Sequence, residues 1–377
     1  MSKNSRWIWQ RSKWPAFIYD HSLAAPALAE AHHIYGVLEG KSQVIAREDF
    51  ETIALEALSD EVLSTAAIEG ERFSIETVHA SVRCKMGPLL GSAGNRYVDG
   101  LVDVVTDTVA QVELPLAADR LCRWQSALFP GEVSRFHQIA VGTFRDGQGP
   151  MQIVSGLPGC EVLHYEAPPS KRVCQEIQRF LEWFNVTSPA LQRVYIDGFA
   201  RAAIAHLWFE SIHPFEDGNG RVGRAIVSMA MAQHLGEPFR LCSLSSQLLT
   251  VQGDYYEALN SAQCGEMDIS DWVRWFTSQS SKACAVAIMR VDKVIALRHF
   301  WDKTETSGLR ERQKTVLRYA LEARGAECID ALNAEKYMSL TGVSKATATR
   351  DLSAMVGSGQ LRTLGRGKAL RYFVNFP

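Results

Sequence analysis

The chain has 377 residues, a formal net charge of −2 at neutral pH, 46% hydrophobic residues and 22% charged residues. This length suffices for two or three domains with their own cores, and the composition is that of an ordinary soluble protein rather than a disordered or fibrous one. No run approaches the roughly eighteen apolar residues of a membrane span, the N-terminus lacks the apolar segment of a signal peptide, and eight cysteines without a CxxC pair indicate reduced thiols in a cytoplasmic protein.

Residues 1–95 are predicted to form an N-terminal helical region. The spacing of apolar residues predicts helices over 24–38 and 50–68. The rings of an aromatic segment before these helices either seal a core or form a stacking platform for nucleic acid, and the lack of a glycine-rich basic context favours the first role. These aromatic residues are Trp7, Trp9, Trp14, Phe17 and Tyr19.

Thr65 and Glu69 lie near the end of the second predicted helix. They are four residues apart and therefore share one helical face, and Gly70 can end the helix. From this spacing alone, Glu69 is most simply a surface carboxylate that closes a helix.

A core domain is predicted over residues 96–289. It starts with helical periodicity from 96 to 129. Two short β-prone runs, 152–154 and 161–164, then flank the turn-forming segment 156–159, and this order predicts a β-hairpin.

Further along the core, a buried helix is predicted over 189–211, and helical periodicity resumes after Arg221. The connecting segment reads His213-Pro214-Phe215-Glu216-Asp217-Gly218-Asn219-Gly220-Arg221-Val222-Gly223-Arg224. Its Gly-Asn-Gly turn delivers the chain into a helix N-terminus, where unpaired backbone N–H groups and the helix dipole favour an anion.

The side chains of this segment are those expected of a phosphate site. Arg221 and Arg224 are three residues apart and can reach one polyphosphate from a single helical face. Asp217 can hold a hard cation such as Mg²⁺ against phosphate oxygens. His213, with an ordinary pKa of about 6.5, is suited to accept a proton near neutral pH. An ordinary structural turn accounts for any pair of these residues, but not for all of them together.

The C-terminal residues 290–377 are predicted to form a separate unit. Within it, residues 296–377 hold 14 Lys and Arg against eight Asp and Glu, so the basic residues of the chain gather there. Three helices and then two strands are predicted, in the order of a winged helix: 310–323, 333–340 and 344–356 for the helices and 361–374 for the strands.

Four basic residues of this unit could contact DNA. Lys345 and Arg350 belong to the third predicted helix, and Arg366 and Lys368 belong to the wing. A role in protein docking or dimerisation is the alternative.

The segment that begins at His213 matches the pattern HxFx[DE]GNGRxxR, and on this ground the chain resembles the Fic family. Every specified position matches: His213, Phe215, Asp217, Gly218, Asn219, Gly220, Arg221 and Arg224. The resemblance implies a mainly α-helical core with a β-hairpin flap. It also implies transfer of AMP from Mg-ATP to a Ser, Thr or Tyr hydroxyl of a target protein.

The resemblance assigns a role to each group. His213 accepts the proton of the hydroxyl, and Asp217 holds Mg²⁺. The hairpin residues Gln152, Ile153 and Val154 resemble the flap that binds the target by strand addition, with a purely structural hairpin as the alternative. The residues assigned to the nucleotide are Gly218, Asn219, Gly220, Arg221, Gly223, Arg224, Tyr255 and Tyr256, the two tyrosines lying in a segment similar to the family's YYxxL sequence at the adenine pocket.

Residues 65–70 are similar to the family's inhibitory motif, [ST]xxxE[GN], at Thr65, Glu69 and Gly70. In the family this glutamate pairs with the second arginine, here Arg224, and leaves ATP poorly placed for attack. We therefore expect autoinhibition by Glu69. The family resemblance also predicts a homodimer. The alternative function is a nucleotide-sensing transcriptional regulator that binds DNA.

Overall fold

The computed structural model describes residues 6–86, 95–131, 139–156, 160, 162–191, 194–305, 308–322, 332–366 and 369–375. The chain divides into two compact units, Met1–Arg290 and Val291–Pro377. Within the described ranges, no helix has both the length and the apolar character that crossing a membrane requires.

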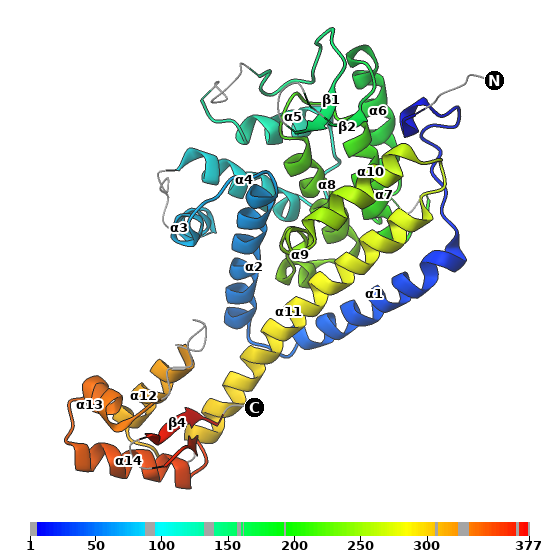
Figure 1. The fold of residues 1–377 in the computed structure, drawn as a ribbon. Coiled ribbons are helices and arrows are strands. Elements are labelled where there is room, and N and C mark those ends of the chain that lie inside the picture. The colour runs from blue at the N-terminus through cyan, green and yellow to red at the C-terminus, as the bar shows by residue number, and fades with distance from the viewer. Residues whose placement is uncertain are drawn as a thin grey trace. The chain divides into compact units, whose positions relative to one another are not determined.

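The first unit is built mainly of helices around a central pair (Figure 1). α7 (Gly198–Ile212) is buried along its whole length because apolar residues lie on every side of it, and it packs on α8 (Asn219–Leu235). Helices α2 (Arg47–Ile68), α4 (Arg96–Ala110) and α5 (Ala118–Ala127) pack against α8. The remaining elements are η1 (Ile8–Gln10), α1 (His21–Ser42), α3 (Ile75–Met86), α6 (Ser170–Val186), η2 (Glu237–Leu241), α9 (Leu244–Thr250), α10 (Gln252–Cys264) and α11 (Ser270–Glu305).

The predicted hairpin is present as β1 (Gln152–Ser155) paired antiparallel with β2 (Val162–Glu166). Within the described residues these two strands form a sheet of their own, so β1 has no further strand beside it. The aromatic segment seals the core, as expected. Trp7 packs edge-on against Tyr165 of β2, and Trp14 donates from its indole nitrogen to Glu176 of α6 at 2.9 Å.

Two predicted helical stretches of the core have different bounds in the structure. The helix expected from residue 189 begins at Gly198, because Asp197 caps it by accepting from the N–H groups of Phe199 and Ala200. The helical stretch expected over 96–129 is two helices, α4 and α5. Pro115, which lies between them, lacks an N–H and disfavours helical backbone in the residue before it. α11 continues to Glu305, beyond the predicted end of the core domain at residue 289.

The second unit contains the three helices and two strands predicted from the sequence, in the predicted order. A buried cluster that includes Val316, Tyr337 and Leu352 forms its core. Lys368, predicted to contact DNA, lies outside the described residues. The elements are α12 (Glu311–Glu322), α13 (Ala334–Thr341), α14 (Lys345–Gly357), β3 (Leu361–Leu364) and β4 (Arg371–Val374), the strands being antiparallel.

Candidate active site

The chain reverses between α7 and α8 through two residues with left-handed backbone conformations. His213 follows α7 with φ 49° and ψ 61°, and its N–H donates to the carbonyl of Phe209 at 2.9 Å, which ends the helix. Gly218, with φ 87°, precedes the first residue of α8. A left-handed histidine persists only where its surroundings fix it, so the site holds the His213 side chain in a set direction.

Asn219 and Arg145 fix the shape of this loop. The Asn219 side chain accepts from the backbone N–H of Phe215 at 2.9 Å and donates to the Phe215 carbonyl at 2.8 Å. Arg145 donates from Nε to the His213 carbonyl at 2.7 Å and from Nη2 to the Pro168 carbonyl at 2.6 Å. Phe215 itself is fully buried. Contacts within the protein are therefore enough to define the loop.

Arg224 and Glu69 form the central ion pair. Arg224 Nη2 donates to Glu69 Oε1 at 2.7 Å, and Arg224 Nε donates to Thr65 Oγ1 at 2.8 Å. A methyl group placed on the Cα of Gly220 would overlap Glu69 Oε1 and lie 3.1 Å from Arg224 Nη1. The carboxylate thus lies against the N-terminal turn of α8, where the helix dipole stabilises an anion.

Arg221 and Asp217 lie next to this pair. Arg221 Nη1 is 3.4 Å from Glu71 Oε1, and its Nη2 is 3.6 Å from Asp217 Oδ1. The Asp217 side chain is 51% exposed and accepts from the N–H of Gly218 at 2.6 Å. Mg²⁺ commonly uses only one or two protein carboxylates and completes its shell with phosphate oxygens and water, and Asp217 fits that arrangement. Among the described residues, no cluster of three His, Cys, Asp or Glu side chains forms a metal cage.

Burial sets the protonation of the groups around the ion pair. Burial, and then the charge of Arg145, lower the pKa of His213 to about 4. Burial raises the pKa of Glu210 to about 8, against the opposing charge of Arg224, and Glu210 Oε2 lies 3.8 Å from His213 Nδ1. Burial alone would raise the pKa of Glu69, but the charge and hydrogen bond of Arg224 outweigh burial and lower it. The imidazole of His213 is therefore neutral at pH 7 and can accept a proton.

The predicted nucleotide-site residues outside the loop occupy different environments. Tyr255 is buried, and its hydroxyl oxygen lies 2.7 Å from His206 Nε2. Tyr256 is 45% exposed, and its hydroxyl donates to a carbonyl at the end of α2 at 3.2 Å. Gly223 faces α7, where an added methyl group would overlap Glu210 Oε1. Tyr256 is thus accessible to a ligand, whereas Tyr255 and Gly223 serve packing.

The hairpin is joined to the site through Tyr165 of β2. Its hydroxyl donates to the Ser211 carbonyl at 2.7 Å, two residues before His213. On β1, Gln152 and Val154 are exposed and Ile153 is half-buried. The free edge of β1 therefore belongs to an element that contacts the end of α7.

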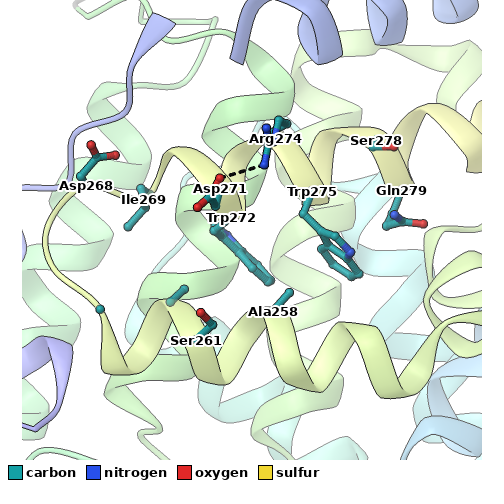
Figure 2. Close-up of a pocket in the computed structure, with 12 residues that line it drawn as sticks. Ala258, Ser261, Asp268, Ile269, Asp271, Trp272, Arg274, Trp275, Ser278 and Gln279 are labelled. Atoms are coloured by element: carbon teal, nitrogen blue, oxygen red, sulfur yellow. Dashed lines mark hydrogen bonds and ion pairs between the residues drawn. The ribbon is translucent and has the colours of Figure 1, made fainter. Parts of the chain in front are cut away.

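A separate hollow of about 550 Å³ lies between α10 and α11 (Figure 2). Trp272 and Trp275 of α11 point across it toward Ala258 and Ser261 of α10. None of the residues predicted from the sequence for catalysis or nucleotide binding lines this hollow. The loop between α7 and α8 is therefore the better candidate for the active site.

Two family models match the chain. Residues 115–231 match the model described as Fic/DOC family, and residues 7–87 match one described as a domain of unknown function (DUF4172). The first match includes the loop, His213 and both arginines.

Residues 115–231 form a Fic/DOC-family region of this chain.

Proteins similar to this chain include named adenylyltransferases. It is 31% identical over 108 residues to protein adenylyltransferase fic-1 of Caenorhabditis elegans, covering 29% of this chain and 19% of that protein. It is 24% identical over 224 residues to protein adenylyltransferase Fic of Nematostella vectensis, covering 58% of this chain and 46% of that protein. The chain thus matches less than half the length of either relative.

A solved structure supports the fold assignment. A Fic family protein from Desulfovibrio desulfuricans G20 superposes with a TM-score of 0.53 at 20% sequence identity, over 93% of this chain and 96% of that chain. At this identity the likeness concerns the fold.

Two residues that shape the site were not found by sequence reasoning. Gln125 of α5 accepts from the Gly142 N–H at 2.5 Å and donates to the Asp217 carbonyl at 3.4 Å, and nothing in its local sequence marks it. Glu210 lies in the last turn of α7, three residues before His213, and its Oε2 is 3.8 Å from His213 Nδ1; an acidic residue this close in sequence to the proposed base was available as a signal. Both residues contact the loop from its surroundings.

Proposed function

We propose that this chain transfers AMP from Mg-ATP to a hydroxyl side chain of a target protein, and that Glu69 holds it in an inactive state. The observation that carries the proposal is the position of the Glu69 carboxylate on Arg224 and against Gly220. A nucleotide phosphate would use the same arginine and the same helix N-terminus. Because one set of donors cannot hold both anions, Glu69 opposes productive binding of the triphosphate.

In the proposed reaction, His213 accepts the proton of the incoming hydroxyl. The hydroxyl oxygen bonds to the α-phosphorus, the bond to the bridging oxygen breaks, and pyrophosphate leaves. Because its pKa is lowered to about 4, His213 is unprotonated at physiological pH and is free to accept a proton. Backbone N–H groups of the first turn of α8 face the charge that develops on the phosphate, and Arg221 and Arg224 bind the outer phosphates.

Asp217 is the residue proposed to hold Mg²⁺, which would neutralise phosphate charge. For the protein substrate, we propose the exposed edge of β1, residues Gln152, Ile153 and Val154, as the surface that pairs with an extended segment. Backbone pairing would place the target hydroxyl next to His213 without requiring a particular neighbouring side chain.

Transfer of label from ATP labelled in its α-phosphate tests this function. Wild type, Glu69→Gly, and Glu69→Gly combined with His213→Ala are incubated with and without cell lysate, and protein-bound label is measured. We expect strong labelling by Glu69→Gly, weak labelling by wild type and none above background when His213 is also replaced. Equal labelling by Glu69→Gly with and without His213 would contradict the proposal. Competition with GTP, UTP and CTP reports the base preference.

A second candidate function, DNA binding by the C-terminal unit, is favoured by the charges of α14. Lys345 and Arg350 are exposed on this helix. Its acidic residue, Asp351, is buried and accepts hydrogen bonds from Arg312 at 2.6 Å and from Tyr337 at 2.9 Å. The solvent-facing side of α14 is therefore basic, as a helix that enters the major groove requires.

Binding of the full chain to random and genomic DNA fragments at low and high salt tests this second function. We expect salt-sensitive binding that is lost when Lys345 and Arg350 are both replaced by Ala and is kept in His213→Ala. Equal binding by the wild type and the double variant would rule out α14 as the DNA-contacting helix.

A further inference from the structure

Local backbone hydrogen bonds satisfy only some of the carbonyl groups at the C-terminal end of α2. The last four carbonyls of a helix have no partner within the helix. Here the Ala66 carbonyl accepts from the N–H groups of Glu69 and Glu71, each at 3.0 Å. The Ala67 carbonyl accepts from the N–H of Gly70 at 3.0 Å. These local bonds satisfy two of the four carbonyls.

The other two carbonyls depend on side chains from the active site. The Thr65 carbonyl accepts from Arg224 Nη2 at 3.0 Å. The Ile68 carbonyl accepts from Gln252 Nε2 at 2.9 Å and from the Tyr256 hydroxyl at 3.2 Å. Two of these three donors, Arg224 and Tyr256, belong to the residues proposed to bind the nucleotide. The last turn of α2 is therefore capped by groups that a bound nucleotide would use.

We propose that Gln252 and Tyr256 keep Glu69 in its inhibitory position by capping the last turn of α2, residues 65–68, which we name the latch turn. Loss of both donors leaves the Ile68 carbonyl of the latch turn without a partner. Buried carbonyls without partners are unfavourable, so the turn opens toward water and withdraws the Glu69 carboxylate from α8. Gln252 is then the positioning residue that keeps the latch turn closed when the site is empty. This inference rests on the proposed function.

The body of α2 is anchored in a way that favours local unwinding over movement of the whole helix. Glu61, two turns before Glu69, is buried, and its carboxylate accepts from Ser243 Oγ at 2.8 Å, from Ser245 N–H at 2.9 Å and from Ser245 Oγ. Moving α2 as a rigid rod would leave this buried carboxylate without its donors, which is strongly unfavourable. Unwinding residues 65–68 leaves the Glu61 contacts in place.

Hydrogen exchange of the full chain tests the latch turn directly. Gln252→Ala combined with Tyr256→Phe removes both donors to Ile68 and keeps the aromatic ring. We expect amide exchange at Glu69, Gly70 and Glu71 to speed up about tenfold in this double variant, because two hydrogen bonds are lost. Exchange over residues 54–62 should not change. Gln247→Ala is the matched control, since this glutamine on α9 donates to Gln279 Oε1 at 3.1 Å and does not cap α2.

Transfer assays then connect the latch turn to regulation. In the wild-type background, the double variant should increase AMP transfer about tenfold, and Gln247→Ala should leave it unchanged. In the Glu69→Gly background, Gln252→Ala should add nothing, because the inhibitory carboxylate is already absent.

The outcomes distinguish a failure of the proposed transferase function from a failure of the latch turn. No labelling by Glu69→Gly above the His213→Ala variant overturns the transferase function, and the exchange data still decide whether residues 65–68 depend on Gln252 and Tyr256. Active Glu69→Gly with unchanged exchange and transfer in the double variant overturns the latch turn. Faster exchange over 54–62 together with 69–71 overturns it too, because the whole helix would then be moving.

Discussion

The loop 213–218 and the end of α2, which contacts Arg224, are held in different ways. On one side, the loop 213–218 is fixed by Asn219 and Arg145, whose bonds to the backbone are internal to the protein. On the other side, the end of α2 relies on Arg224 itself and on Tyr256, which are also the groups proposed to bind the nucleotide. The difference places the proposed chemistry on a rigid element and its control on an element that depends on a few side-chain caps.

The largest expected effect comes from removing the proposed base on the rigid side. In the Glu69→Gly background, His213→Ala should lower the rate of AMP transfer by about 10²–10⁴-fold, the usual contribution of a general base, while nucleotide affinity stays similar. His164→Ala is the control, because this histidine of β2 contacts Ser155 Oγ on the hairpin. Initial rates and equilibrium nucleotide binding measure the two quantities. Equal losses in both variants would remove His213 from its proposed role.

Asn219→Ala should break the rigidity of the loop. It leaves the backbone N–H and carbonyl of Phe215 without partners in a buried place, which should destabilise folding by about 2–4 kcal/mol. Asn185→Ala is a close control, since Asn185 makes the same two bonds to the backbone of Leu116, at 2.9 and 2.8 Å, away from the loop. Thermal unfolding should show similar losses for both. Only Asn219→Ala should also abolish transfer by Glu69→Gly protein, and retained activity would show that the loop has other supports.

The rigid side was largely predictable from the sequence. Eight residues at fixed spacing indicated a turn into a helix N-terminus with a base and two arginines, and the structure places them together. The pairing of Glu69 with Arg224 was implied by the family resemblance of residues 65–70, and the spacing alone did not predict it. The helices were recognised from apolar periodicity, apart from bounds set by local chemistry, such as the Asp197 cap and Pro115.

The contacts that control the site, at the end of α2 and around Glu210, were harder to predict from the sequence. Gln252 lies about 180 residues after Ile68 in the chain, and a single polar residue on a helix carries no sign of the carbonyl that it will reach. Glu210 reads as one acidic residue in an apolar helix, whereas its burial and raised pKa arise from the packing of α7 against α8. Such features depend on tertiary contacts, which periodicity does not encode.

Glu210→Gln should change how the free energy of unfolding depends on pH. The carboxyl has a folded pKa of about 8 against an ordinary value near 4.5, so the wild-type unfolded state releases its proton first as the pH rises. Wild type therefore loses stability from this group between about pH 4.5 and 8, and the glutamine variant does not. Relative to wild type, the variant should gain about 1–3 kcal/mol across that window. Urea unfolding at several pH values measures the difference, and parallel curves would show that Glu210 ionises normally.

The smallest effect is expected from Glu71, the other carboxylate that faces the arginines. Its side chain is 40% exposed, and its nearest oxygen is 3.4 Å from Arg221, whereas Glu69 lies 2.7 Å from the buried Arg224. Exposed ion pairs contribute about 0–1 kcal/mol, so Glu71→Ala should change AMP transfer by less than about fivefold. Glu69→Ala, measured in parallel, should activate far more strongly. Comparable activation by both variants would mean that Glu71 on Arg221 and Glu69 on Arg224 both inhibit transfer. Inhibition would then not depend on a single contact with Arg224.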